Sequence, residues 1–322
     1  MTTSDANIII LPDVISSCSL ELECNPYYEV ISKETDAWPS SHGISRDESE
    51  TKFNFLEALV YPYACRSRLR DLCDLCTTAF IYGYILDSSS KDDISEQAKQ
   101  QMFYNIWDSF QQGGSFKPLI TFASVIHGWW QRILVNARPT FQQRFKTTFR
   151  DAIEASLRQE TYKNDHQIIP DLKTYNELRD DSMYELIGCT LIQYSLGFDL
   201  PDECLANETL KCIMECMMDS GSWANTIKIK DIYSFNNESS KDQYNLISVL
   251  MNANPSPSIQ QAMDQAGQMV IDVYAHFERL RSQLLSWGAD IDAQIEKICG
   301  WHGQIITRKS SMEFRNTKIF WI

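Results

Sequence analysis

Apolar residues recur at intervals of three and four along much of the chain, and this spacing predicts α-helices. The clearest case is one long helix that begins after Ser258, with Gln261 three residues later as in a capping box. Its apolar stripe comprises Met263, Ala266, Val270, Val273, Phe277, Leu280 and Leu284. A second helix is predicted from Pro170 to Gly197, because glycine suits the left-handed conformation that often ends a helix.

Proline and polar stretches mark the predicted interruptions. Pro139 divides the periodic segment 128–159, which is therefore predicted to form two helices or one kinked helix. Residues 110–118 (FQQGGSFKP) are predicted to form a loop, and 40–52 (SSHGISRDESETK) a polar connector.

Together these patterns predict one all-α domain over residues 1–322, a helical bundle on which residues 1–50 pack as an N-terminal segment. Strand patterns are scarce, and the chain has neither an internal repeat nor a long low-complexity linker. An apolar fraction of 43%, with 8 Trp, 14 Tyr and 15 Phe, is sufficient for a sizeable core.

The formal net charge of −14 argues against binding to nucleic acids or to membrane surfaces, which usually requires a basic patch. No apolar run approaches the length of a transmembrane helix, so membrane insertion is not expected. The opening MTTSDANIIILPDV lacks the basic region of a signal peptide. A cytoplasmic location with reduced cysteines is therefore expected. A zinc site is not, because no Cys/His set has finger spacing.

The stretch FIYGYILDSSSKDDISEQ, an aromatic helix that ends in carboxylates, is the first candidate for chemistry. Phe80 and Tyr84 lead to Asp87, and Asp92 follows after three serines and a lysine. Clustered carboxylates beside apolar surface suit Mg²⁺, which binds a few hard oxygens and leaves room for waters and phosphates. The alternative is an ordinary ion pair between Asp87 and the lysine four residues on.

Further polar groups suit a phosphate or a metal. Lys230, Ser234 and Glu238 recur at intervals of four, so they share one helix face; the alternative is a solvated surface. Arg179 lies in a predicted helix beside two aspartates, either as their ion-pair partner or as a fork for phosphate oxygens. Arg308 follows the last apolar segment, where a surface charge is the plain alternative.

The order of these groups along an all-α chain resembles that of class I terpene synthases, most closely the fungal sesquiterpene synthases. The resemblance covers nearly the whole chain. Its motifs are LPD followed by NPYYEV, then NFLEALVYPYACRSRLRDLCDLCTTAFIYGYILD, IPDLKTYNELRDDSMYELIG with a later LGFDLP, and KDIYSFNNE. Each motif alone is weakly specific, whereas all of them in the family's order are strongly specific. The resemblance implies a single helical bundle around an apolar pocket.

The resemblance also implies roles for individual residues. Asp87 matches the first aspartate of the family's aspartate-rich motif, and Ser234 and Glu238 match two ligands of its second metal motif. Arg179 matches the arginine that senses the diphosphate, and Arg308 the arginine of a C-terminal Arg-Tyr pair. In that family these groups bind three Mg²⁺ ions and the diphosphate of farnesyl diphosphate. Ionisation then yields an allylic cation that cyclises in the pocket.

The chain departs from the family's pattern at several positions. Two acidic positions of the aspartate-rich motif are lost, which leaves Asp92 or Asp93 as substitute ligands. Lys230 replaces the first ligand of the second motif, Asn237 replaces the basic residue before its last glutamate, and Lys309 replaces the C-terminal tyrosine. An ammonium group cannot ligate a metal, but it can bind a diphosphate oxygen directly. The number of Mg²⁺ ions is therefore open, with fewer than three as the alternative.

The resemblance thus implies a carbon–oxygen lyase that ionises farnesyl diphosphate with Mg²⁺ and cyclises the cation to a sesquiterpene, and we expect a monomer or homodimer. Its catalytic cations would be Arg179, Lys230 and Arg308. Aromatic candidates for the pocket, each with a core role as the alternative, are Phe55, Phe80, Tyr84, Trp223, Tyr233 and Trp301. Two other functions are open: coupling of a terpenyl cation to an external nucleophile, and a degenerate domain that binds an isoprenoid without catalysis.

Overall fold

Every secondary-structure element in the described part of the chain is an α-helix, which confirms the all-α expectation. The computed structural model describes residues 10, 12–13, 16, 23–41, 53–88, 96–112, 114–117, 121–165, 169, 171–180, 183–225, 246–253 and 257–300. The chain divides into two units, which we name after a central helix of each. The α3 unit is Glu23–Leu157 with Leu186–Leu200, and the α13 unit is Met1–Leu22, Arg158–Glu185 and Pro201–Ile322.

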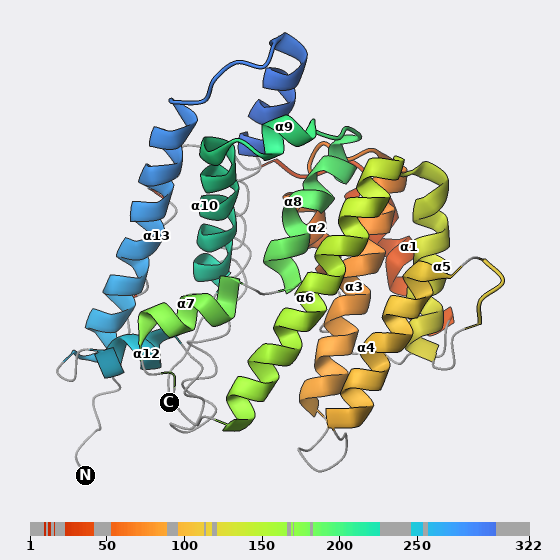
Figure 1. Ribbon diagram of the computed structural model, residues 1–322, viewed down its shortest axis with the longest axis horizontal. Coiled ribbons are helices and arrows are strands. Elements are labelled where there is room, and N and C mark those ends of the chain that lie inside the picture. The colour runs from red at the N-terminus through yellow and green to blue at the C-terminus, as the bar shows by residue number, and fades with distance from the viewer. Residues whose placement is uncertain are drawn as a thin grey trace. The chain divides into compact units, whose positions relative to one another are not determined.

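The α3 unit is built around a buried aromatic core. Its helices are α1 (Tyr28–Ser41), α2 (Phe53–Val60), α3 (Arg66–Ser88), α4 (Glu96–Gln111), α5 (Thr121–Asn136), and the greater parts of α6 (Pro139–Asp165) and α8 (Met183–Leu196). Helix α3 packs against α1, α2 and α5, and α4 packs against α5 (Figure 1). The core rings come from α4, α5 and α6 and are Phe110, Trp129, Trp130, Phe141, Phe145 and Phe149.

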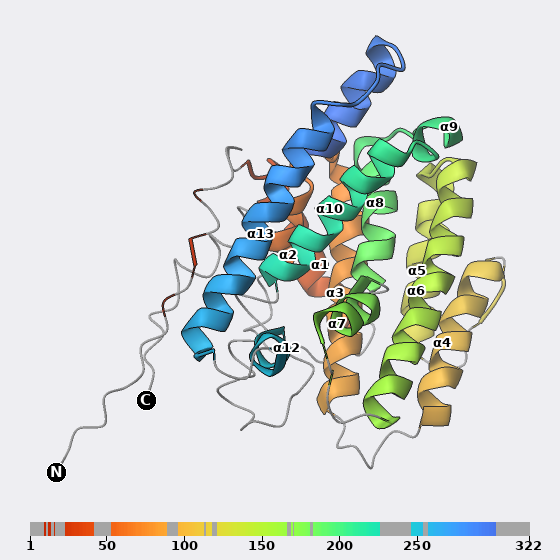
Figure 2. The ribbon, with the colours of Figure 1, turned by 60° about the vertical axis from the view of Figure 1, so that its left-hand side comes forward.

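In the α13 unit, three helices share one apolar cluster. The helices of this unit are α7 (Leu172–Asp180), α9 (Asp202–Leu205), α10 (Glu208–Asn225), α12 (Leu246–Ala253) and α13 (Ile259–Arg281), followed by helical residues 289–300. Helix α13 packs along α10, and α12 lies between α13 and α7 (Figure 2). The buried members of what we call the α7–α12–α13 cluster include Tyr175, Leu246, Ile247, Val249, Leu250, Ala262, Met263, Ala266 and Val270.

The predicted interruption at Pro139 is confirmed in its two-helix form. Helix α5 ends at Asn136 and α6 begins at Pro139 itself, where the missing N–H has no intrahelical partner to lose. The loop predicted for 110–118 begins slightly later than expected, because α4 continues to Gln111. The connector predicted for 40–52 likewise begins later, because α1 continues to Ser41; the rest of it lies outside the described residues.

The predicted start of the long helix at Ser258 is also confirmed. Its hydroxyl accepts a hydrogen bond from the Gln261 N–H at 3.2 Å, and the Ser258 N–H donates to the Gln261 side chain at 2.7 Å. The predicted end was too late, because α13 stops at Arg281 and Leu284 lies beyond it. Ser282 ends the helix there, and the next backbone bonds span three residues rather than four.

The segment predicted as one helix from Pro170 to Gly197 contains two, α7 and α8, and residues 181–182 between them lie outside the described residues. Its predicted end is confirmed: Gly197 follows α8 with φ of 78°, and its N–H donates to the carbonyls of Gln193 and Tyr194. No described helix is long and apolar enough to cross a membrane. That residues 1–322 act as one domain stays a prediction.

We predict that Gly197→Ala destabilises the protein by roughly 1–3 kcal/mol. The positive φ disfavours any residue with a Cβ, and a Cβ at this position would overlap the guanidinium of Arg68. The matched control is Gly128→Ala within α5, where a Cβ meets nothing within 4 Å. Chemical denaturation should show the control unchanged or slightly more stable, and equal stabilities of the two variants would contradict the prediction.

Candidate functional site

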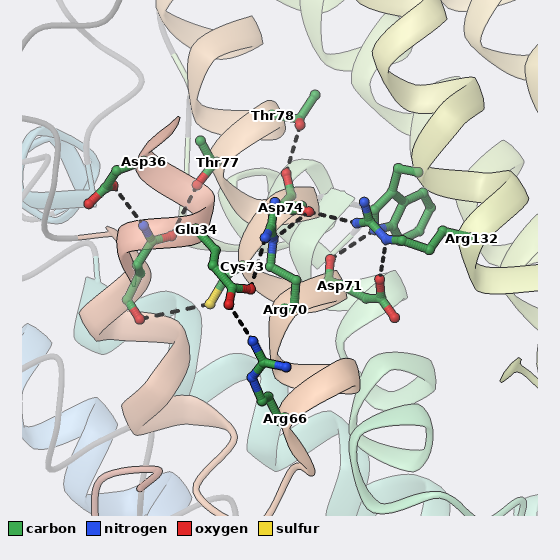
Figure 3. Close-up of polar contacts among 12 residues, drawn as sticks. Glu34, Asp36, Arg66, Arg70, Asp71, Cys73, Asp74, Thr77, Thr78 and Arg132 are labelled. Atoms are coloured by element: carbon green, nitrogen blue, oxygen red, sulfur yellow. Dashed lines mark hydrogen bonds and ion pairs between the residues drawn. The ribbon is translucent and has the colours of Figure 1, made fainter. Parts of the chain in front are cut away.

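Two carboxylates of α3 lie buried in the α3 unit and share one arginine. The side chains of Asp71 and Asp74 are 3% and 0% exposed. Arg132, from α5, donates from Nε to Asp71 at 2.7 Å and from Nη2 to Asp74 at 2.6 Å (Figure 3). Burial lowers the pKa of Arg132, but Asp74 and Asp71 outweigh it and raise that pKa above its usual value. The guanidinium is therefore a permanent charge that joins α5 to α3 at two points.

Asp71 and Asp74 accept further hydrogen bonds from donors on α3, α5 and α8, and one of these donors also pairs with α1. Arg70 donates to both oxygens of Asp74 at 2.8 and 2.9 Å, and also reaches Glu34 of α1 at 3.1 Å. The hydroxyl of Tyr194, from α8, donates to Asp71 at 2.6 Å. The indole N–H of Trp129 donates to the Asp71 backbone carbonyl at 2.8 Å. We call this set the Asp71–Asp74 network.

Acid–base chemistry is not a natural role for the Asp71–Asp74 network. Burial raises the pKa of the Asp74 carboxyl, while the arginines Arg70 and Arg132 act in the opposite direction. Burial and the neighbouring Asp71 raise the pKa of Tyr194 far above its usual value, so its hydroxyl stays protonated as a donor. Since guanidinium and hydroxyl donors already occupy these carboxylates, the network positions α3 rather than transferring protons.

A second polar contact fixes α2 against α1 and α3. Asn54 of α2 is 1% exposed. Its amide donates to Asp36 of α1 at 2.9 Å and accepts from the hydroxyl of Thr77 of α3 at 3.2 Å (Figure 3). Helix α3 is thus held in rotation and register by polar contacts along its first three turns.

The fixed register of α3 determines where Asp87 falls. The buried positions Leu69, Cys73 and Cys76 recur at intervals of four and three. Continuing this spacing leads to Phe80, Tyr84 and then Asp87, the last residue but one of α3. Three sequence-predicted site residues therefore lie at helical intervals from one another along α3, with Asp87 in its last turn.

Arg179 holds the equivalent position in the α13 unit. It is the last residue but one of α7 and lies four residues after Tyr175, which is 1% exposed in the α7–α12–α13 cluster. Its neighbour Leu178 packs against the same cluster. Helix α7 packs on α12 and contacts α10, and these two helices flank residues 226–245. Helix α7, which carries Arg179 in its last turn, therefore contacts both helices that precede and follow this segment in the chain.

The remaining predicted site residues are placed only in part. Trp223 lies on α10, seven residues after buried Cys216 and so in register with it. The ring of Phe55 on α2 lies 5.0 Å from that of Tyr28 on α1. The predicted residues that lie outside the described part of the chain are Asp92, Asp93, Lys230, Tyr233, Ser234, Asn237, Glu238, Trp301, Arg308 and Lys309.

Among the described residues, no group of three or more histidine, cysteine, aspartate or glutamate side chains is arranged to hold a metal. Asp71, Asp74 and Arg132 are not among the site residues predicted from the sequence. One signal was available: two aspartates three residues apart, and so on one face of a helix, stand among apolar residues in RLRDLCDLC. Carboxylates at such buried positions require cationic partners, but the sequence does not show which arginine supplies the charge.

The arrangement of these helices is that of class I terpene synthases. The solved structure of α-eudesmol synthase superimposes with a TM-score of 0.76 at 16% identity, covering 91% of this chain and 98% of that one. Hedycaryol synthase in complex with nerolidol gives a TM-score of 0.71 at 17% identity, covering 94% and 99% of the two chains. At these identities the likeness establishes the fold, and it confirms the expected fold class.

The sequence comparisons define the family. Residues 74–276 match the model of terpene synthase family 2, C-terminal metal binding, and the chain belongs to this family. Sesquiterpene synthase 3 of Postia placenta is 29% identical, over 91% of this chain and 79% of the relative. Alpha-muurolene synthase of Coprinopsis cinerea is 29% identical, over 89% and 68%. The predicted family is therefore confirmed, and the family's description agrees with a divalent metal cofactor.

We predict that Arg132→Ala lowers the free energy of unfolding by roughly 3 kcal/mol. It would leave Asp71 and Asp74 buried without their shared cation, although Asp74 keeps Arg70. The matched control is Arg150→Ala on α6, where an exposed arginine pairs with exposed Asp151 and the expected loss is below about 1 kcal/mol. Urea denaturation of both variants measures the difference, and similar losses would show that the network is dispensable.

Proposed function

We propose that this protein is a metal-dependent sesquiterpene synthase that ionises farnesyl diphosphate and cyclises the resulting carbocation. The observation that carries the proposal is the family match over residues 74–276, which includes Asp87, Arg179 and the KDIYSFNNE motif in the family's order. The fungal relatives are named as sesquiterpene synthases, which favours a substrate of fifteen carbons. Neither the coupling enzyme nor the degenerate binding domain is favoured by these comparisons.

In this proposal the metal ligands are Asp87, Ser234 and Glu238, with Asp92 or Asp93 as a further ligand. Their carboxylate and hydroxyl oxygens are the donors that Mg²⁺ prefers. Bound Mg²⁺ would neutralise charge that develops on the leaving diphosphate. The position of Asp87 in the last turn of α3 fits such a role.

Three basic residues would bind the diphosphate directly. Arg179 lies in the last turn of α7, and its planar fork suits two phosphate oxygens at once. Lys230 and Arg308 would add two further cations from other parts of the chain. Lys230 stands where the family has a ligand, so it would supply charge to the diphosphate in place of part of a metal's charge.

Aromatic side chains would enclose the hydrocarbon part of the substrate. The candidates are Phe55, Phe80, Tyr84, Trp223, Tyr233 and Trp301. Their faces stabilise a carbocation and exclude the water that would quench it. Phe80 and Tyr84 precede Asp87 by two turns and one turn on α3, which fits a pocket lying below a metal-bearing rim. A cytoplasmic location and a monomeric or homodimeric state stay predictions.

We predict that the protein releases inorganic diphosphate from farnesyl diphosphate only in the presence of Mg²⁺ or Mn²⁺. The family's metal-binding description and the retained oxygen donors are the reason. A coupled diphosphate assay with geranyl, farnesyl and geranylgeranyl diphosphate measures both the chain-length preference and the metal requirement. Absence of release from all three substrates would reject the proposed function.

We predict that Arg179→Ala and Glu238→Ala each reduce kcat by about 10²–10³-fold while the protein remains folded, because each removes a group that faces the leaving diphosphate. The matched control for Arg179 is Lys173→Ala, an exposed position on the same helix. Turnover should be unchanged in the control. If Arg179→Ala retains near-wild-type turnover with an unchanged circular dichroism spectrum, Arg179 is a surface charge.

We predict that Lys230→Asn lowers turnover at saturating Mg²⁺. If the lysine neutralises diphosphate charge, a neutral amide in its place loses that contribution. Loss of the neighbouring basic position at Asn237 makes this role more important. The rate of diphosphate release measured against Mg²⁺ concentration distinguishes this role of Lys230 from simple blocking of a metal ligand. A variant that is faster and saturates at lower Mg²⁺ would show instead that Lys230 only blocks a metal ligand.

A further inference from the structure

The N-terminal segment is fastened to α13 by one backbone position and one proline. The Ile10 N–H donates to Oε1 of Gln260 at 2.8 Å, and Nε2 of Gln260 donates to the Ile10 carbonyl at 2.8 Å. Pro12 lies against Gly267, which is seven residues after Gln260 on α13. We call Ile10 and Pro12 the strap. Both of its contacts fall on one side of α13, because residues seven apart on a helix share a face.

Two residues of α13, Gln260 and Gly267, allow the strap to bind there. The Gln260 amide satisfies both the N–H and the C=O of Ile10, as a neighbouring strand would. Gly267 is buried within α13, and a Cβ there would overlap Cβ and Cγ of Pro12. Glycine in a helix interior is unfavourable relative to alanine, so its presence here is explained by the close approach of the proline ring.

The part of α13 that binds the strap also belongs to the α7–α12–α13 cluster. Ala266 and Val270, on either side of Gly267 along α13, belong to the α7–α12–α13 cluster. Leu178, the neighbour of Arg179, packs on the same cluster. Helix α12 borders the segment with Ser234 and Glu238. Because protein cores are close-packed and transmit displacement, a shift of α13 is passed on to α7 and α12.

We propose that the strap sets the position of α13, and through the cluster that of α12 and of α7, the helix that carries Arg179. Gln260 and Gly267 are then positioning residues for binding of the metal and the diphosphate. This inference rests on the proposed function of the site. It assigns the N-terminal segment a role in catalysis, although neither strap residue is proposed to touch the substrate.

The direct test is Gly267→Ala, in which the new methyl group displaces Pro12. We expect the Mg²⁺ concentration for half-maximal diphosphate release to rise on the order of tenfold. Gly128→Ala is the control, because its Cβ meets nothing within 4 Å. A loss of stability alone would reduce the amount of active enzyme and hence kcat, but would leave the half-saturating Mg²⁺ of the folded molecules unchanged. An unchanged value in Gly267→Ala therefore overturns the proposal.

A rescue experiment separates the strap from other effects of the new methyl group. Pro12→Gly removes both ring atoms that the Cβ would meet, so adding Gly267→Ala to Pro12→Gly should cause no further change. If Gly267→Ala has the same effect with and without Pro12, the methyl group acts independently of the strap and the proposal is wrong.

A second variant, Gln260→Ala, tests the strap without adding a methyl group inside the fold, and so keeps the test valid if Gly267→Ala misfolds. Gln260→Ala removes both bonds to Ile10 and should raise the half-saturating Mg²⁺ in the same direction as Gly267→Ala. Gln268→Ala is its matched control, because Gln268 makes the same bond to an aspartate four residues on, but none to the strap. Equal effects of the two glutamine variants would reject a role for the strap contact.

Hydrogen–deuterium exchange tests the inference independently of catalysis. In Gly267→Ala, peptides from α7 and α12 should exchange faster than in the wild type, whereas Gly128→Ala should leave them unchanged. If the wild type releases no diphosphate, the proposed function fails while this measurement still tests the strap. If the wild type is active and exchange in α7 and α12 is unaltered by Gly267→Ala, the strap inference alone fails.

Discussion

The pairing of Arg132 with both Asp71 and Asp74 is the constraint on which the α3 unit depends most. Two carboxylates at nearly unexposed positions of one helix require cations at fixed places, since an unpaired buried charge costs several kcal/mol. In the register observed, Arg132 of α5 pairs with both carboxylates and Tyr194 of α8 donates to Asp71. The network thus fixes the rotation of the helix that carries Asp87 at its far end.

In both units a proposed site residue lies in the last turn of a helix. Asp87 is the last residue but one of α3, and Arg179 is the last residue but one of α7. The body of each helix supplies packing, and its last turn supplies a charged side chain where the helical hydrogen bonds end.

Local signals in the sequence predicted part of this structure. The capping box at Ser258, the break at Pro139 and the left-handed Gly197 depend on neighbouring residues, and all three are confirmed. The predicted end of α13 and the prediction of one helix from Pro170 to Gly197 were wrong, because apolar residues continue past the points where α13 and α7 end. The family's motifs predict roles for Asp87 and Arg179, which stay predictions, whereas the pairing of Asp71 with Arg132 spans 61 residues and has no local signature.

The central claim is that the protein converts farnesyl diphosphate into a cyclic sesquiterpene. The most direct measurement is gas chromatography with mass spectrometry of the products formed from farnesyl diphosphate and Mg²⁺, with and without added amine or alcohol nucleophiles. The account predicts a cyclic C15 product that is the same in both cases and disappears when the metal is chelated. Nucleophile adducts as the main product, or only linear farnesol, would contradict it.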